Sequence, residues 1–172
     1  MVKLVKPSIE HEIVFKEMMR DYTNHDEDTF NRDYFTKDFS FVQYIQDIDE
    51  LSQGIGLPDG YVPTTEWWLM NDEYEIVGTV RLRHFLSDRN RQEGGHIGYD
   101  ISPRFRGHGF GTKILKLVLD KARELGLTEV LLTCDSDNGV SIKVIESNGG
   151  KLENEIISND TQKRVYRYWI NL

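Results

Sequence analysis

The chain reads Arg106-Gly107-His108-Gly109-Phe110-Gly111-Thr112 where a predicted strand is followed by the strongest predicted helix. Glycines at alternate positions allow a tight turn and keep side chains away from a bound ligand. The backbone N–H groups of Gly109, Gly111 and Thr112 can then point at an anion, assisted by the helix dipole and by Arg106. These residues therefore predict a cradle for a diphosphate.

Two better-known phosphate motifs fit this segment badly. A P-loop needs four residues between its first Gly and its Gly-Lys pair, whereas three residues separate Gly107 from Gly111, and Thr112 precedes Lys113. The dinucleotide fingerprint is Gly-x-Gly-x-x-Gly at an early strand–turn–helix unit, but this chain has Gly-x-Gly-x-Gly. On these residues alone, a glycine-rich turn without a ligand stays an alternative.

Hydrophobic periodicity predicts an α/β (α+β) fold with a mixed, mostly antiparallel sheet of about seven strands and helices on both faces. Strand-helix-strand order over residues 96–134 predicts parallel neighbours joined by a right-handed crossover. One predicted helix starts at Ser8, and three others cover residues 41–51, 112–125 and 138–147. The predicted strands cover residues 2–6, 64–70, 75–85, 95–101, 129–134, 152–157 and 164–170.

Composition limits the function classes. The length of 172 residues fits a single domain, 1–172. The net charge of −8 gives no general attraction to nucleic acid or anionic lipid and suits a cationic ligand. A single Cys134 excludes an intrachain disulfide and a cysteine zinc site, and the five His lack ligand spacing, so no metal is expected. Without an apolar run of about 18 residues or a secretory segment, we expect a cytoplasmic protein with no membrane partner.

The segment from His96 to Gly150 resembles the acetyl-coenzyme A binding region of the GNAT superfamily of N-acetyltransferases. The family signature is Arg or Gln, two residues, Gly, one residue, then Gly or Ala, and it is matched by Arg106, Gly109 and Gly111.

Flanking residues extend this resemblance. The strand at 97–103 is similar to the family's fourth strand, and Asn138 and Ser141 match the Asn-x-x-(Ala or Ser) opening of a later helix. The order of elements agrees over nearly the whole chain, although the motifs lie within 96–150. Residues 133–150 are most similar to a subgroup of predicted acetyltransferases whose substrates are unknown.

The resemblance implies transfer of an acetyl group from acetyl-coenzyme A to a primary amine of a small molecule or peptide, in a ternary complex. It implies a cofactor-binding core at about 75–150 and acceptor-side elements at about 8–63, and it leaves a homodimer open. The implied cofactor-binding residues are Ile101, Arg106, Gly107, His108, Gly109, Phe110, Gly111, Thr112 and Asn138. Asn138 could equally be a helix cap.

One departure from the family keeps a second function class open. Related enzymes often carry a Tyr seven residues after the Asn, as general acid to the departing thiolate, and this chain has Ile145 there. The alternative is a non-catalytic module that senses acyl-coenzyme A.

For the catalytic base, His96 and Asp100 alternate with Gly98 on one face of a strand. Related enzymes often have Glu at the position of His96, and a His with a pKa near neutrality can accept a proton directly or through water. Asp100 is the second candidate and His84 the third. A structural His96, with proton loss to water, is the alternative.

The acceptor site is expected from the region 30–63 and the final hairpin. Aromatic residues could form an amine pocket there by cation–π contact, or could equally pack in the core: Trp67, Trp68, Tyr166, Tyr168 and Trp169. Cys134 could donate a proton to the leaving thiolate, with core packing as the alternative. The acidic run at 25–28 is interpreted as a solvated segment rather than a metal site.

Overall fold

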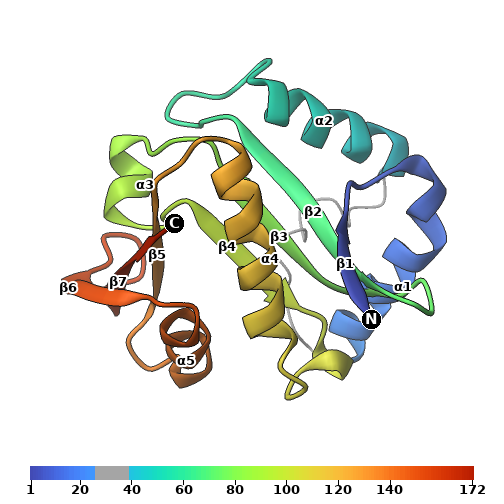
Figure 1. Ribbon diagram of the computed structural model, residues 1–172. Helices are drawn as coiled ribbons and strands as arrows, with labels where there is room; N and C mark the ends of the chain where they lie inside the picture. The colour runs from blue at the N-terminus through green and yellow to red at the C-terminus, as the bar shows by residue number, and fades with distance from the viewer. Residues whose placement is uncertain (26–38) are drawn as a thin grey trace.

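Two sheets with antiparallel strand pairs lie side by side in the computed structural model, which describes residues 1–25 and 39–172 (Figure 1). The first sheet has the strand order β1 (Val2–Val5), β2 (Thr64–Asn71), β3 (Ile76–Arg83) and β4 (Ile97–Ile101). The second has the order β5 (Glu129–Asp135), β7 (Arg164–Asn171) and β6 (Lys151–Ile157). These strands confirm the predicted fold class.

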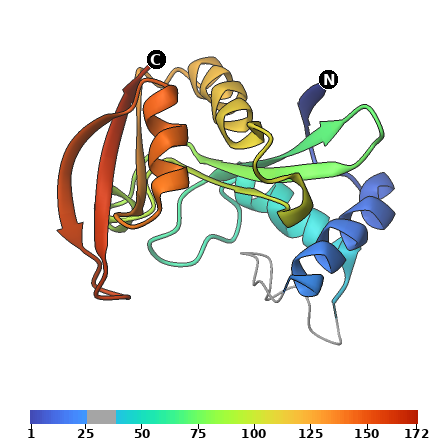
Figure 2. The same ribbon diagram turned by 90° about the horizontal axis from the view of Figure 1, so that it is seen from below.

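Helices cover both faces of the first sheet (Figure 2). The long α4 (Phe110–Glu124) packs on one face, with α5 (Gly139–Ser147) beside it, while α1 (Glu12–Asn24) and α2 (Phe41–Gln53) pack on the other. Successive side chains of β2 point to opposite faces of the sheet. Trp67 and Leu69 therefore pack in the α4 core, while Trp68 and Met70 pack in the α1–α2 core. The sheet therefore separates two hydrophobic cores.

The ends of the helices follow local sequence signals. Ser40 caps α2 by accepting a hydrogen bond from the backbone N–H of Gln43 at 3.3 Å, and Gly54 ends the helix in the left-handed conformation. The helix α4 begins at Phe110, two residues earlier than predicted. A short α3 (Asp88–Gln92) was not predicted from the sequence; it has no buried residue and hence no apolar stripe to reveal it. Among the described residues, two 3-10 turns, η1 (Ile9–His11) and η3 (Pro103–Phe105), also occur.

The predicted parallel neighbours β4 and β5 meet at one end. The backbone N–H of His96, just before β4, donates to the carbonyl oxygen of Leu131 at 2.7 Å, and the two strands then belong to separate sheets. On its other edge β4 pairs with β3, where Ser102 N–H donates to Val77 O at 3.0 Å. Because hydrogen bonds alternate in an antiparallel pair, the backbone groups of Tyr99 and Ile101 point away from β3, toward the split.

Candidate active site

A cavity of about 570 Å³ lies between β4, the N-terminus of α4 and the start of α5. We call it the cofactor cavity. It brings together every predicted cofactor-binding residue except His108, which is exposed on the outside of the glycine turn. Its lining residues are Tyr99, Asp100, Ile101, Phe105, Arg106, Gly107, Gly109, Phe110, Gly111, Thr112, Asn138, Val140, Ser141 and Val144.

The glycines of the turn serve two different purposes. Gly107 and Gly109 have φ angles of 78° and 79°, where other residues are strained, and a Cβ atom at either would meet nothing within 4 Å. At Gly111 a Cβ atom would lie 3.1 Å from Val144 Cγ2, so this glycine allows α4 and α5 to approach. The first N–H groups of α4, which have no partner within the helix, lie at this cavity and favour an anion.

Arg106 joins the glycine turn to β4. Its Nε donates to the carbonyl oxygen of Ile101 at 2.9 Å, and its guanidinium lies 3.6 Å from the Asp100 carboxylate. Asp100 also accepts a hydrogen bond from Tyr22 of α1, and burial together with the Asp100 charge raises the pKa of Tyr22. The carboxylate of Asp100 is therefore part of a hydrogen-bonded network at the end of β4.

Two hydroxyl groups meet inside the cofactor cavity. Tyr99 Oη lies 3.0 Å from Ser141 Oγ, and burial raises the pKa of Tyr99, so the phenol keeps its proton at neutral pH. Asn138 caps α5 by accepting a hydrogen bond from Ser141 N–H at 3.0 Å, and it lines the same cavity. Ile145, at the family's Tyr position, is buried in the α4 core. Sequence reasoning noted Ser141 only as a motif residue and gave no site role to it or to Tyr99, which looked like an ordinary strand residue.

His96 lies at the point where β4 and β5 meet, outside the lining of the cofactor cavity. Its Nδ1 accepts a hydrogen bond from the backbone N–H of Leu131 at 2.9 Å, so the neutral ring carries its hydrogen on Nε2. Burial, followed by the charges of Arg91 and Arg83, lowers the pKa of His96 to about 4. His84, the third candidate, has Nε2 at 2.8 Å from Thr65 Oγ1, and burial lowers its pKa.

Other predicted site residues lie in the cores. Trp67, Trp68 and Tyr168 are buried there, which favours core packing for these aromatic residues. Cys134 is buried in the α4 core, and burial raises the pKa of its thiol to about 11. Residues 26–28 of the acidic run, and residues 30–38 of the expected acceptor region, lie outside the described residues.

The residues that the structure describes, 1–25 and 39–172, contain neither a metal-binding cluster nor a membrane-spanning helix. No group of three or more His, Cys, Asp or Glu side chains there could hold a metal ion. No helix in those ranges is long and apolar enough to cross a membrane.

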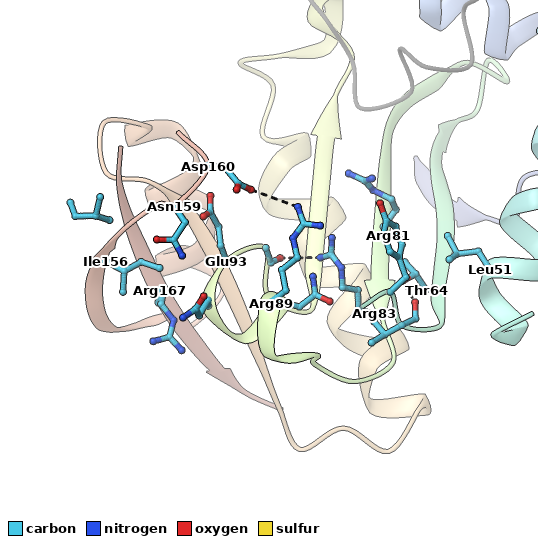
Figure 3. Close-up of a pocket in the computed structure, with 16 residues that line it drawn as sticks. Leu51, Thr64, Arg81, Arg83, Arg89, Glu93, Ile156, Asn159, Asp160 and Arg167 are labelled. Carbon is cyan, nitrogen blue, oxygen red and sulfur yellow. Dashed lines mark hydrogen bonds and ion pairs between the residues drawn. The ribbon is translucent and has the colours of Figure 1, made fainter. Parts of the chain in front are cut away.

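A second cavity, of about 650 Å³, is lined by residues of β3, α3, β6 and β7 (Figure 3). Arg81 of β3 lines it and is the register partner of Gly98, where an added Cβ atom would lie 3.6 Å from Arg81 Nη2. Because successive strand residues face opposite ways, Gly98 and this cavity lie on the face opposite Tyr99. We call this cavity the arginine pocket. Sequence reasoning missed it.

Solved acetyltransferase structures share this fold. RimL, the ribosomal L7/L12 α-N-protein acetyltransferase in complex with coenzyme A, matches with a TM-score of 0.73 and 18% identity over 99% of this chain and 94% of that one. The microcin C7 self-immunity acetyltransferase MccE, in complex with acetyl-CoA and AMP, matches with a TM-score of 0.72 and 16% identity over 99% and 92%. Mutant forms of the spermidine/spermine N-acetyltransferase SpeG from Vibrio cholerae match with a TM-score of 0.64 and 14% identity over 99% and 95%. No curated protein sequence matches the chain.

A split sheet with a glycine cradle at the N-terminus of a helix is the architecture of an acyl-coenzyme A-dependent transferase. The family model for the acetyltransferase (GNAT) domain matches residues 16–151, most of the chain, so the chain belongs to the GNAT family. It is an acetyl-coenzyme A-dependent N-acetyltransferase, which confirms the predicted activity and acyl donor.

Proposed function

We propose that the acetyl group passes directly from acetyl-coenzyme A to a primary amine of a small molecule or peptide, with the two substrates bound on opposite faces of β4. The observation that carries this proposal is a pair of cavities next to the split between the sheets: Tyr99 of β4 lines one, and Arg81, beside Gly98 on the other face of β4, lines the other. A ternary complex needs both substrates at one reacting centre. The buried, protonated thiol of Cys134 argues against a covalent acyl-enzyme.

In this proposal the cofactor is held mainly by backbone. The N–H groups at the start of α4 and around Gly107 and Gly109 bind the diphosphate, and the backbone of Ile101 binds the pantetheine arm along β4. Asn138 contacts the arm from α5. The cofactor-binding core thus lies within residues 75–150, and residues 8–63 contribute to the acceptor side. The predicted cytoplasmic location and the homodimer stay predictions.

The departing thiolate needs a proton, and the family's usual donor is absent at Ile145. We assign this role to Tyr99, whose phenol lies 3.0 Å from Ser141 Oγ inside the cofactor cavity. General acid catalysis requires a group that is protonated at the working pH, and the raised pKa of Tyr99 meets that requirement.

Proton removal from the amine is the least constrained step. His96 and Asp100 stay the predicted bases, but hydrogen bonds to Leu131 N–H and to Tyr22 already occupy acceptor positions on them. We propose that His96 positions the junction of β4 and β5, and that the amine loses its proton to water in the open arginine pocket.

A thiol-release assay on the purified chain tests the proposed function. The panel contains amino acids, peptide N-termini, aminoglycosides and polyamines, because the structural neighbours are named for acceptors as different as a ribosomal protein and spermidine. Acetyl-coenzyme A binding is measured in parallel by calorimetry. Turnover with any amine supports the transferase, whereas tight cofactor binding without turnover across the panel would favour the sensor module.

A further inference from the structure

The arginine pocket is a local concentration of positive charge in an acidic chain of net charge −8. Arg81 and Arg83 come from β3, Arg89 from α3 and Arg167 from β7. Among the described residues, the acids that line it are Glu93 and Asp160. Figure 3 shows Arg81, Arg83 and Arg89 grouped on one side, with Asp160 reaching toward Arg89 from the final hairpin.

Arg89 and Arg167 each form an ion pair with a carboxylate. Arg89 Nη2 lies 3.6 Å from Asp160 Oδ2, with both side chains more than two-thirds exposed. Arg167 Nη1 lies 3.2 Å from Glu153 Oε2 and is largely buried. An exposed ion pair such as Arg89–Asp160 is weak and exchanges readily, so the Arg89 guanidinium can turn to a ligand.

Arg83 differs from both. Its Nη1 donates to the carbonyl oxygens of Gly94 and Gly95, each at 3.0 Å, which fixes the guanidinium at the pocket wall without neutralising it. Burial, followed by the charges of Arg81 and Arg89, lowers the pKa of Arg83 to about 10, and among the described residues the Tyr61 phenol acts in the other direction. Arg83 therefore lies partly desolvated among like charges, an arrangement that a bound anion would stabilise.

Arg81 connects this charge to the reacting centre. Its Nη2 lies over Gly98, the neighbour of Tyr99, where the missing side chain leaves the strand open. Glu66 is its register partner on β2, and burial raises the pKa of the Glu66 carboxyl against the smaller, lowering effects of hydrogen bonds from Tyr44 and Trp68 and of the Arg81 charge. A ligand anion bound at Arg83 and Arg89 would thus place the rest of the molecule beside β4.

We propose that the acceptor carries a carboxylate or phosphate group besides its amine, and that Arg83 and Arg89, with Arg81, bind this group in the arginine pocket. The inference rests on the proposed function, since it names the acceptor class of the same site. A guanidinium presents paired donors that match both anions. A polyamine or aminoglycoside would instead add positive charge to a cluster of like charges, so the cationic acceptors suggested by the net charge are disfavoured.

Matched acceptor pairs test this proposal in the thiol-release assay. Each pair shares the amine and differs in the anion: an amino acid against its amide, and an aminoalkyl phosphate against the amino alcohol. We expect the anionic member of at least one pair to have a KM at least about tenfold lower, and the two pairs distinguish carboxylate from phosphate. Arg89→Gln should raise that KM about tenfold with kcat nearly unchanged, whereas Arg123→Gln, on the exposed face of α4, should leave it unchanged.

A binding measurement separates this proposal from the transferase function. Inorganic phosphate should bind the wild-type chain in calorimetry, and more weakly in Arg89→Gln than in Arg123→Gln. If phosphate binds in this way but no amine is acetylated, the arginine pocket is still an anion-binding site, and the proposed transferase function is wrong. A different result would overturn the anionic acceptor but support the transferase function. In that result, polyamines or amines without an anionic group have a KM equal to or lower than that of the anionic acceptors, and Arg89→Gln does not change this KM.

Discussion

The two cavities on either side of β4 recognise their ligands by different means. The cofactor cavity is built largely from one stretch of the chain, residues 99–112, which includes the glycines that expose backbone N–H groups. The arginine pocket is built from side chains of β3, α3, β6 and β7, far apart in the sequence. The backbone site suits a ligand shared by a whole family, and the side-chain site can change its specificity without altering the fold.

The largest effect is expected at the cofactor cavity, in Gly109→Glu. The new side chain would place bulk and negative charge in the open space where the diphosphate binds. We expect the affinity for acetyl-coenzyme A, measured by calorimetry, to fall at least about 100-fold, or about 2.7 kcal/mol.

Gly109→Ala is the matched control. Alanine causes the same backbone strain at φ 79°, of about 1 kcal/mol, without the charge. Its affinity should stay within about tenfold of the wild type, while the two variants should melt at similar temperatures. Equal affinity in both variants would mean that strain, rather than anion repulsion, weakens binding, and that the diphosphate lies elsewhere.

The contrast between the two cavities also explains what the sequence could predict. The helical spacing of Ile114, Leu115, Val118, Leu119, Ala122 and Leu125 predicts one apolar face, because periodicity reports one face of one element. All of these residues are buried except Leu125, which lies after the last turn of α4 and is 45% exposed. The glycine turn was likewise visible as a local motif. The arginine pocket depends on which strands become neighbours in the fold, and this pairing cannot be predicted from any single segment of the sequence. The ring of His96 is hydrogen-bonded to a backbone N–H of another strand, which has no sequence signal at all.

A smaller effect is expected for Tyr99→Phe, on the cofactor side of β4. Removing the hydroxyl takes away the proposed proton donor but keeps the ring that packs against the α4 core. Because a thiol with a pKa near 8.5 is already a good leaving group, we expect kcat to fall by only about tenfold. The KM for both substrates should change little.

Ser141→Ala provides the comparison for this variant. It removes the partner hydroxyl 3.0 Å from Tyr99 Oη and leaves the phenol in place, so it should reduce kcat less than Tyr99→Phe does. Unchanged kcat in Tyr99→Phe, at a pH where chemistry limits the rate, would remove Tyr99 from the mechanism.

The smallest effect on turnover is expected at the junction between the cavities, in His96→Asn. The Asn side-chain oxygen can take the place of Nδ1 and accept the hydrogen bond from Leu131 N–H, whereas the longer Gln cannot do so from the same position. If His96 positions β4 against β5, Asn should keep kcat within about threefold. Gln should lower the free energy of unfolding by about 1–3 kcal/mol, because it leaves a buried N–H without its acceptor. If His96 is instead the base, both variants should lose about 100-fold in kcat and the acid limb of the pH–rate profile.

The same residue predicts how stability depends on pH. The pKa of His96 is lowered from 6.5 to about 4 in the folded chain, so between these values the unfolded chain binds the proton more readily. Above pH 6.5 the His96 ring is neutral in both states, so its titration does not reduce the free energy of unfolding. As the pH decreases from 6.5 to 4, the free energy of unfolding falls by up to about 3 kcal/mol. Denaturant titrations at a series of pH values give the free energy of unfolding of wild type and of His96→Asn. Plotted against pH between 4 and 6.5, this free energy should fall less steeply for the variant than for the wild type. Parallel curves would show that the ring is solvated, and that its hydrogen bond to Leu131 does not hold the two sheets together.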